Sequence, residues 1–295
     1  MKRLTLSYER RRSLTGFLFA LPFIIGAITF FIRPFIGTII YSLSKIEYGD
    51  TGTTISFLGI KNYTDAFVAN SEFLPAFLDS LGNVLYEVPF ILVFSLGMAV
   101  VLCGDFKGRT FFRAAFFLPL IISSGPAAAA AQGSASNLYS GDTSVMMFEA
   151  ISIEPLLMSF DLSEGLITVI VGIINNIFNL TLKSGVQILI FIAGIKAIPT
   201  YLYEVTQIEG ANRWETFWLV TFRMISPMLL INIVYTIIDS FSDVSNPVMK
   251  FINTMTQNLK IELGSAAATV YFLSILILLL VVIAVWNRFL SDDAN

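Results

Sequence analysis

The chain has 295 residues, a formal net charge of −3 at pH 7 and a mean hydropathy of +0.78. Hydrophobic residues make up 56% of it and charged residues only 13%, about half the charged share of a typical soluble domain, so we predict an integral membrane protein. The single cysteine excludes an internal disulfide, the absence of histidine argues against a zinc site or an imidazole-based triad, and no cluster of basic and aromatic residues suggests nucleic-acid binding.

Six apolar stretches follow one another along the chain, each near or above the ~20 residues that a helix needs to cross a bilayer. They cover residues 14–42, 81–102, 111–131, 166–198, 225–242 and 263–289. The sequence therefore predicts an all-α, polytopic membrane protein with six transmembrane helices. These helices form one domain, 14–290, between a cytoplasmic N-terminal segment, 1–13, and a cytoplasmic tail, 291–295.

The first stretch follows a group of basic residues, as the core of a secretory signal peptide does. Its apolar run is longer than such a core and shows no clear cleavage site. We therefore predict an uncleaved first span with the N-terminus in the cytoplasm. Pro22 and the Arg33-Pro34 pair are expected to kink this span, because proline removes a backbone hydrogen bond from a helix.

The fourth stretch, 166–198, is longer than one straight span requires. Polar residues interrupt it between Asn175 and Gly185. The stretch is either one long bent helix or a short outer helix that leads into a span starting near Asn179, and the sequence does not decide between them.

Basic residues are distributed unevenly among the connecting segments, and cytoplasmic loops are usually the ones enriched in lysine and arginine. With six spans and a cytoplasmic N-terminus, the cytoplasmic segments hold Lys2, Arg3, Arg10, Arg11, Arg12, Lys107, Arg109, Arg113, Lys196, Arg213, Arg223 and Arg288. The outer segments hold only Lys45, Lys61, Lys250 and Lys260. This asymmetry supports the six-span prediction and places the connection 199–224 in the cytoplasm.

The connection 199–224 is a polar, helix-patterned island between two apolar spans. Tyr201, Val205 and Ile208 recur at helical spacing, and Gly210 follows at a position where a left-handed residue would end the helix. A second helix can begin near Asn212 and carry aromatic residues back to the membrane. We expect a helix–turn–helix with Glu204 on an exposed face. An ordinary connecting loop with interfacial aromatic residues fits the pattern equally well.

Polar side chains also occur inside the predicted spans, where lipid makes them costly. They are Asn83, Glu87, Asn175, Asn176, Asn179, Lys183, Asn232 and Tyr235. Amide and phenol groups can bind hydroxyl-rich ligands, so we expect these residues to line a water-filled path for a substrate. For each of them, hydrogen bonding between helices is the alternative role.

Four segments of the chain carry motifs of a known family. They are GFLFALPFIIGAITFFIRPFIGTIIYSLSK in the first span, FLGIKNYTDAF after it, GRTFFRAAFFLPLIIS at the third span, and Glu204 with Gly210, Ala211, Arg213-Trp214, Phe217 and Pro227. Together they resemble the permease subunits of binding-protein-dependent ABC importers, in particular the carbohydrate branch. The chain departs from the family pattern at Val205 and Thr206 in place of two alanines, at Glu209 in place of aspartate, and at Arg223 in place of a proline.

This resemblance implies a type I ABC importer permease fold in a bacterial cytoplasmic membrane, with a coupling helix in the 199–224 loop that docks into the ATPase. The coupling residues that it implies are Glu204, Gln207, Ile208, Glu209, Gly210, Ala211, Arg213 and Trp214. It also implies a second permease, a pair of ATPase subunits and an extracytoplasmic solute-binding protein as partners, besides membrane lipid. The chain has no phosphate-binding G-x-x-x-x-G-K loop. ATP and magnesium are therefore expected in the ATPase subunits, and no catalytic or metal-binding residue is expected here.

The residues do not identify the transported solute. Similarity to the carbohydrate branch favours a sugar, and an oligosaccharide in particular. An importer permease for glycerol phosphate, a polyamine or an amino acid is one alternative, although an anionic solute would need more basic residues in the path than Arg33 and Lys183 provide. An intramembrane enzyme is the other alternative, and the lack of histidine and of paired acidic residues on one span argues against it.

Overall fold

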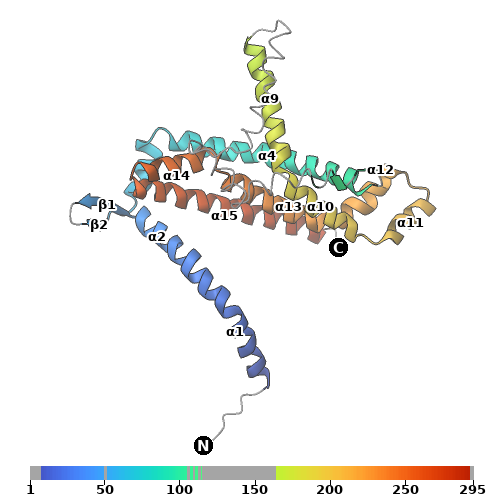
Figure 1. The fold of residues 1–295 in the computed structure, drawn as a ribbon, viewed down its shortest axis with the longest axis horizontal. Coiled ribbons are helices and arrows are strands. Elements are labelled where there is room, and N and C mark those ends of the chain that lie inside the picture. The colour runs from blue at the N-terminus through green and yellow to red at the C-terminus, as the bar shows by residue number, and fades with distance from the viewer. Residues whose placement is uncertain are drawn as a thin grey trace, which may run out of the picture. The chain divides into compact units, whose positions relative to one another are not determined.

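The computed structural model describes residues 8–49, 52–104, 107–108, 110–111, 114 and 164–292. The chain divides into two compact units, the first formed by Met1–Phe77 with Lys250–Ser274 and the second by Leu78–Met249 with Ile275–Asn295. Nearly all of the elements are helices (Figure 1). One two-stranded hairpin in the first unit departs from the all-α prediction.

The first unit begins with a continuous helical run. It consists of α1 (Tyr8–Ala27), the π-helical turn η1 (Ile28–Ile32) and α2 (Arg33–Ser42). The π turn directly precedes Pro34, whose ring would clash with a carbonyl in a regular α-helical ladder. Because the amide of Arg33 instead donates to the carbonyl of Ile28, the ladder widens by one residue and the helix continues past the proline.

The hairpin follows α2 directly and is held at its base by the segment after it. Strand β1 (Ser44–Gly49) pairs antiparallel with β2 (Gly52–Phe57), with Ser44 opposite Phe57. The buried Asn62 side chain donates to the carbonyls of Ser42 and Ser44, at 2.9 and 2.8 Å. The Tyr63 hydroxyl also shares a 2.7 Å hydrogen bond with the Ser42 hydroxyl, so the Asn-Tyr pair of the FLGIKNYTDAF segment has a structural role at the end of the first span.

An aromatic cluster in the first unit centres on Phe73. After the short helices α3 (Lys61–Thr64) and η2 (Asp65–Ala69), α4 (Phe73–Cys103) begins, and Phe73 is fully buried. Its ring lies 5.1 Å from Phe67 and 5.3 Å from Phe251, between ring centroids. Because Phe73 is held in this aromatic contact, α4 begins well before the predicted residue 81.

The next helices that the structure describes begin at Glu164. They are α9 (Glu164–Lys183), α10 (Gly185–Ala197), α11 (Thr200–Ile208), α12 (Arg213–Thr216), η3 (Phe217–Phe222), α13 (Arg223–Ser242), α14 (Pro247–Gln257) and α15 (Ile261–Asp292). In the second unit α10 packs closely on α13, since a β-carbon at Gly194 would lie 2.8 Å from Met228 Cγ. The core there includes Ala99, Leu102, Ile188, Phe191, Ile192 and Ile225.

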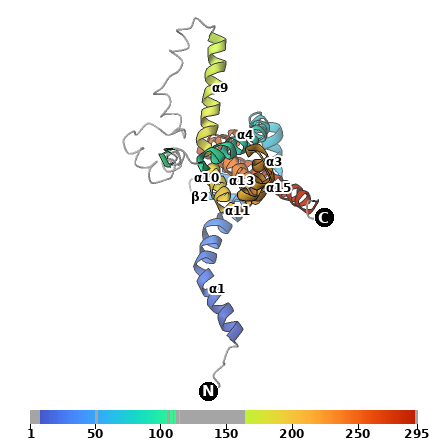
Figure 2. The same ribbon diagram turned by 90° about the vertical axis from the view of Figure 1, so that its right-hand side faces the viewer.

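The predicted fourth span is a bent pair of helices. α9 and α10 meet at 47°, and Ser184 separates them. Figure 2 shows α9 projecting away from α10 and α13. The break at Ser184 lies five residues beyond Asn179.

Four helical stretches in the described residues are long and apolar enough to cross a membrane, and a fifth if α9 and α10 form one bent span. The four are Thr15–Ser42, Phe73–Cys103, Arg213–Gln257 and Ile261–Arg288. The predicted third span, 111–131, lies almost wholly outside the described residues, so the six-span count stays a prediction.

Candidate functional site

The connection after α10 is a helix–turn–helix, as the sequence predicts. Pro199 is the extended residue just before α11, and the helix ends in a left-handed glycine, Gly210, with φ of +77°. The amide of Gly210 donates to the carbonyl of Gln207 at 3.2 Å, and that of Ala211 to Thr206 at 2.9 Å. These two bonds form a Schellman motif, which satisfies carbonyls at the helix end and reverses the chain.

The second helix of the turn starts with a reciprocal cap. The Asn212 side chain accepts from the amide of Glu215 at 2.9 Å, and the Glu215 carboxylate accepts from the amide of Asn212 at 2.7 Å. This capping box fixes the direction in which α12 leaves the turn. Trp214, Phe217 and Trp218 then form a contiguous aromatic group, with ring centroids 5.2–6.1 Å apart.

One side of the turn packs on other helices of the second unit, to which the turn itself belongs. Thr206 is buried, and Leu202 and Tyr203 contact the hydrophobic core of this unit. The Tyr203 hydroxyl shares a 3.1 Å hydrogen bond with Thr221, so α11 is also linked to η3. The turn therefore packs against the helices α4, α10 and α13.

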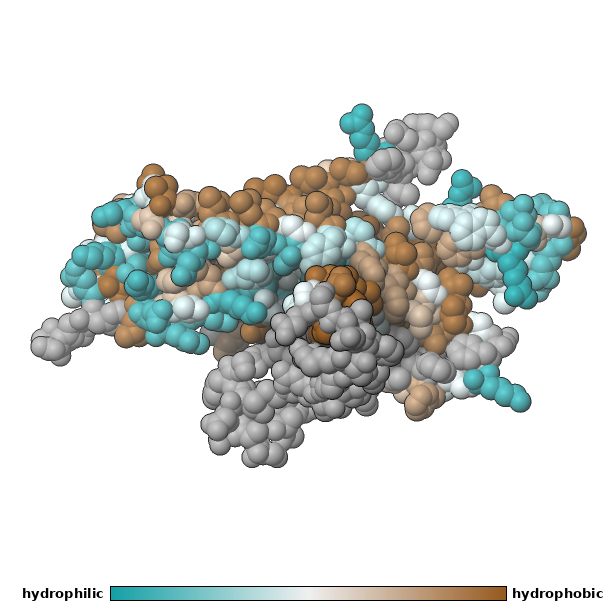
Figure 3. Space-filling model, turned by 90° about the horizontal axis from the view of Figure 1, so that it is seen from above, coloured by the Kyte–Doolittle hydropathy of each residue, from teal (hydrophilic) through white to brown (hydrophobic). Residues whose placement is uncertain are grey.

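The other side of the turn is exposed. Ile208 is 85% exposed and Trp214 is 68% exposed, and both flank the Gly210 reversal. Of the coupling residues that the resemblance implies, Ala211 is half-buried. The others are exposed, and they are Glu204, Gln207, Ile208, Glu209, Gly210, Arg213 and Trp214. Figure 3 shows hydrophilic and hydrophobic residues side by side at the end of the view where α11 and α12 lie. An exposed apolar pair with charged neighbours is a surface suited to a protein partner.

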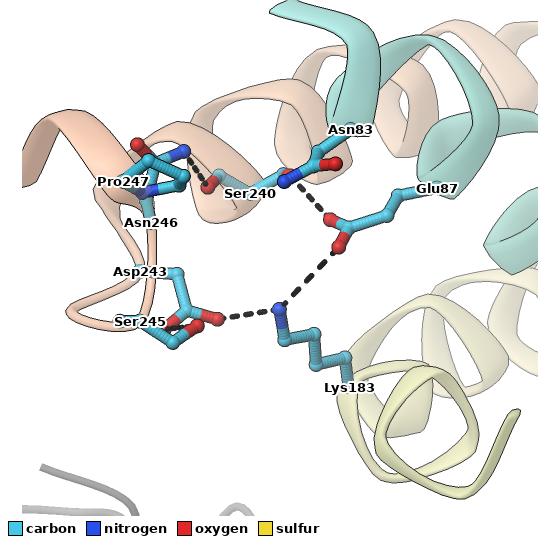
Figure 4. Close-up of a pocket in the computed structure, with 8 residues that line it drawn as sticks. All are labelled: Asn83, Glu87, Lys183, Ser240, Asp243, Ser245, Asn246 and Pro247. Atoms are coloured by element: carbon cyan, nitrogen blue, oxygen red, sulfur yellow. Dashed lines mark hydrogen bonds and ion pairs between the residues drawn. The ribbon is translucent and has the colours of Figure 1, made fainter. Parts of the chain in front are cut away.

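A second group of polar residues surrounds Lys183, the last residue of α9 (Figure 4). Its ammonium lies 2.5 Å from Asp243 Oδ2 and 3.9 Å from Glu87 Oε1. The Ser240 hydroxyl donates to the other oxygen of Glu87 at 2.6 Å. The group therefore joins α4, the α9–α10 break and the end of α13 through charged side chains that are mostly removed from solvent.

These residues line a small open cavity of about 40 Å³. Its walls are formed by Asn83, Glu87, Lys183, Ser240, Asp243, Ser245, Asn246 and Pro247. This volume is far below the ~300 Å³ at which typical ligand pockets begin, so the cavity has room for a few water molecules or one or two hydroxyl groups of a larger ligand. Two carboxylates face a single ammonium, so the lining carries an excess of negative charge.

The structure brings together only some of the polar residues expected along a substrate path. Asn83, Glu87 and Lys183 line the cavity. Tyr235 is half-buried and Asn232 is completely buried, whereas Asn176 on α9 is exposed and Asn179 is half-buried. The side chain of Asn175 lies outside the described residues.

Asn232 belongs to a contact between α10 and α13. Its amide nitrogen donates to the carbonyl of Gln187 at 3.4 Å, and the Gln187 side chain donates to Thr236 at 3.2 Å. The side-chain oxygens of Gln187 and Asn232 have no hydrogen-bond partner among the described residues. Within this chain, the position of Asn232 matches hydrogen bonding between helices.

Sequence reasoning missed the cavity residues that follow α13. The loop residues Asp243, Ser245 and Asn246 hold one another, since the Asp243 carboxylate accepts from both the amide and the hydroxyl of Ser245 at 2.8 Å. The Asn246 amide donates to the Ser80 hydroxyl at 2.8 Å and so ties this loop to α4. The run of Asp, Ser and Asn residues from 239 to 246 was the available signal.

Comparison with known proteins gives several ABC transporter permeases as relatives. YesP of Bacillus subtilis strain 168, named as a probable ABC transporter permease, is 28% identical over 235 residues, which cover 79% of this chain and 72% of that protein. The arabinooligosaccharide permease AraP of the same organism is 27% identical, covering 76% of this chain and 68% of AraP. The multiple-sugar permease MsmF of Streptococcus mutans is also 27% identical, covering 72% of this chain and 70% of MsmF. No family model matches the chain.

The chain is a homologue of sugar ABC transporter permeases. Two crystal structures of bacterial alginate ABC importers share its fold. One covers 95% of this chain and 97% of the matched chain, with a TM-score of 0.61 at 18% identity. The other, a complex with a periplasmic protein bound to an alginate pentasaccharide, covers 98% of both chains, with a TM-score of 0.64 at 17% identity.

These findings confirm the resemblance seen in the motifs. Permease homologues are integral membrane proteins and transport subunits, not enzymes themselves, and the apolar helices of this chain agree with that placement. At 17–18% identity the alginate structures establish the fold and say nothing about the sugar that this permease transports.

Proposed function

We propose that this permease homologue is the transmembrane subunit of an ATP-driven importer for a carbohydrate, most suitably an oligosaccharide. The observation that carries the proposal is the turn from α11 to α12. Its shape is fixed by the Gly210 reversal and the Asn212 cap, and it presents Ile208 and Trp214 to a partner. A simple connecting loop would need neither of these two devices.

In this proposal the turn transmits the movement of ATPase subunits, which bind ATP and magnesium and face the cytoplasm. Docking at Ile208 and Trp214 would move α11, and the contacts of Leu202 and Tyr203 with the hydrophobic core would pass that movement to α10 and α4. The cavity would then alternate between outward and inward access. The N- and C-termini lie in the cytoplasm in this arrangement.

The proposal also requires a second permease and an extracytoplasmic solute-binding protein. No residue of the most apolar 18-residue window in the first span, Thr15–Ser42, is buried among the described residues, so this span can contact lipid or another permease. A structurally similar alginate importer has been crystallised with its periplasmic protein, which supports a comparable partner here.

The cavity around Lys183 supports a neutral rather than an acidic sugar. Its amides, hydroxyls and carboxylates can accept and donate hydrogen bonds to sugar hydroxyls. The excess of carboxylates over ammonium groups would repel a carboxylated sugar. We therefore place one or two hydroxyl groups of a neutral oligosaccharide at this cavity during transport.

Uptake into proteoliposomes tests the proposal. The chain would be purified with its co-encoded subunits, reconstituted, and supplied with binding protein and ATP, and the uptake of neutral oligosaccharides such as arabino-oligosaccharides would be compared with that of uronic-acid oligosaccharides. We expect ATP-dependent uptake of a neutral oligosaccharide. Preferential uptake of the acidic series would contradict the assignment of the cavity, and the absence of ATP-dependent uptake of any sugar would contradict the proposed function.

A further inference from the structure

Three large apolar side chains are exposed between the last residue of β2 and the start of α4. Phe57 is 80% exposed, Ile60 is 71% exposed and Val68 is 85% exposed. The same segment directs Asn62, Ala66 and Phe67 inward, and these residues bond or pack within the first unit. The outward apolar residues therefore contribute nothing to the core of this unit.

Backbone hydrogen bonds hold this segment beside the end of the first span. The amides of Leu58 and Gly59 donate to the carbonyl of Leu43, at 2.8 and 3.1 Å. Leu43 is the residue that directly follows the apolar stretch Thr15–Ser42. Phe57 and Ile60, the chain neighbours of the two donors, are therefore held at the level where the first span leaves the membrane.

The other end of the segment is tied to a second span. Val68 lies in η2, whose neighbour Phe67 packs on Phe73 at the start of the apolar helix Phe73–Cys103. The segment therefore runs between the ends of two spans. The exposed Lys61 lies within the segment, where its ammonium group can meet lipid phosphates.

From this placement we propose that residues 57–68 form an interfacial anchor, which inserts Phe57, Ile60 and Val68 into the boundary between lipid headgroups and acyl chains. The occupant of this apolar surface is the bilayer itself, and the anchor is continuous with the lipid-accessible surface of the first span. The anchor would hold the base of the hairpin at the membrane while its tip points into water. The proposal rests on the span ends and is independent of the transported solute.

Spin labels at single cysteines test the anchor, because Cys103 is the only native cysteine of the chain. In a Cys103→Ser background, Phe57→Cys, Ile60→Cys and Val68→Cys would be labelled one at a time, with Thr53→Cys on the exposed part of β2 as the matched control. The full chain, purified with its bound subunits, would be reconstituted in vesicles of phosphatidylethanolamine and phosphatidylglycerol. Power saturation would then measure collisions with oxygen, which concentrates in lipid, and with a water-soluble nickel chelate.

We expect the ratio of oxygen to nickel accessibility at the three positions to exceed the ratio at residue 53 by about threefold or more, as for groups buried in the interface. A nickel-accessible label at all three positions would overturn the anchor and place the segment in water. Labels shielded from both reagents would also overturn it, because a protein partner would then cover the surface. The Cys103→Ser complex with no introduced cysteine, treated with the same spin label, supplies the background signal from other subunits.

Discussion

The turn from α11 to α12 and the polar group around Lys183 are stabilised in opposite ways. The turn uses neighbours in the sequence, since its hydrogen bonds join residues no more than five positions apart at Gly210 and Asn212. The polar group uses partners that are far apart, since Lys183 meets Glu87 and Asp243 from two other segments. A local change should therefore distort the turn alone, whereas a change at Lys183 should loosen three segments at once.

The largest effect is expected from Lys183→Met, which leaves two poorly solvated carboxylates without their counter-charge. Removing one partner of a fully buried ion pair costs ~3–5 kcal/mol, and partial exposure here should reduce the loss of stability to about 2 kcal/mol. The thermal unfolding midpoint of the purified protein measures this loss.

The matched control for this change is Lys250→Met, because Lys250 is an exposed lysine on α14. The double variant Lys183→Met with Asp243→Asn should recover part of the stability, since it removes one of the uncompensated charges. Equal unfolding midpoints for Lys183→Met and Lys250→Met would show that the polar group does not hold the three segments together.

Gly210→Val should damage the turn while leaving the spans intact. No atom lies within 4 Å of a β-carbon built at Gly210, so the cost arises from its φ of +77° alone. A left-handed conformation costs about 1–2 kcal/mol for a residue with a β-carbon, and more for a β-branched one. We expect loss of substrate-stimulated ATP hydrolysis and transport, with normal membrane insertion.

Gly210→Asn is the matched control for the turn, because asparagine tolerates the left-handed region better than valine does. It should retain most of the coupled ATP hydrolysis. If valine and asparagine variants both transported normally, the turn would be a plain connection and the coupling assignment would be wrong.

Asn212→Ala should have a smaller effect in the same turn. Loss of a helix N-cap costs ~1 kcal/mol, and here it leaves the amide of Glu215 without its acceptor. Coupled ATP hydrolysis should fall partially in Asn212→Ala. It should stay close to the rate of the unsubstituted protein in Asn212→Asp, because a carboxylate can also cap the helix. A fall as complete as that of Gly210→Val would mean that the Asn212 side chain contacts the partner directly.

The contrast between local and distant partners also explains what the sequence could predict. The positions of Pro199, Gly210 and Asn212 predicted the turn, because each acts on its own neighbours. For the cavity, sequence reasoning selected Asn83, Glu87 and Lys183 as polar residues in apolar helices. Nothing local indicated that they would meet one another or the loop at Asp243.

The hairpin was missed for the same reason. Its strands read as a polar connection, and both faces of β2 are exposed, so no alternation of apolar residues marks it. Its base is instead fixed by Asn62, whose side chain reaches back to the carbonyls of Ser42 and Ser44. A side chain that satisfies backbone groups nearly twenty residues earlier leaves no periodic pattern in the sequence.

The smallest effect is expected at Lys45, which provides a solvated counterpart to Lys183. Its ammonium lies 2.6 Å from Glu47, with both side chains more than half exposed. The hydrogen bond with Glu47 raises the pKa of Lys45, and the same bond lowers the pKa of Glu47. The contribution of the pair to stability is therefore present at neutral pH. It is lost as pH falls through the lowered pKa of Glu47 or rises through the raised pKa of Lys45.

Solvent screening makes the contribution of such an exposed pair small. Lys45→Met should therefore leave the unfolding midpoint unchanged at pH 7, within the error of the measurement, and Glu47→Gln should behave alike. Lys183→Met, measured beside them under the same conditions, should lower it clearly. A large loss in Lys45→Met would show that burial does not distinguish the two lysines, and the hairpin would then depend on its charges as strongly as the polar group does.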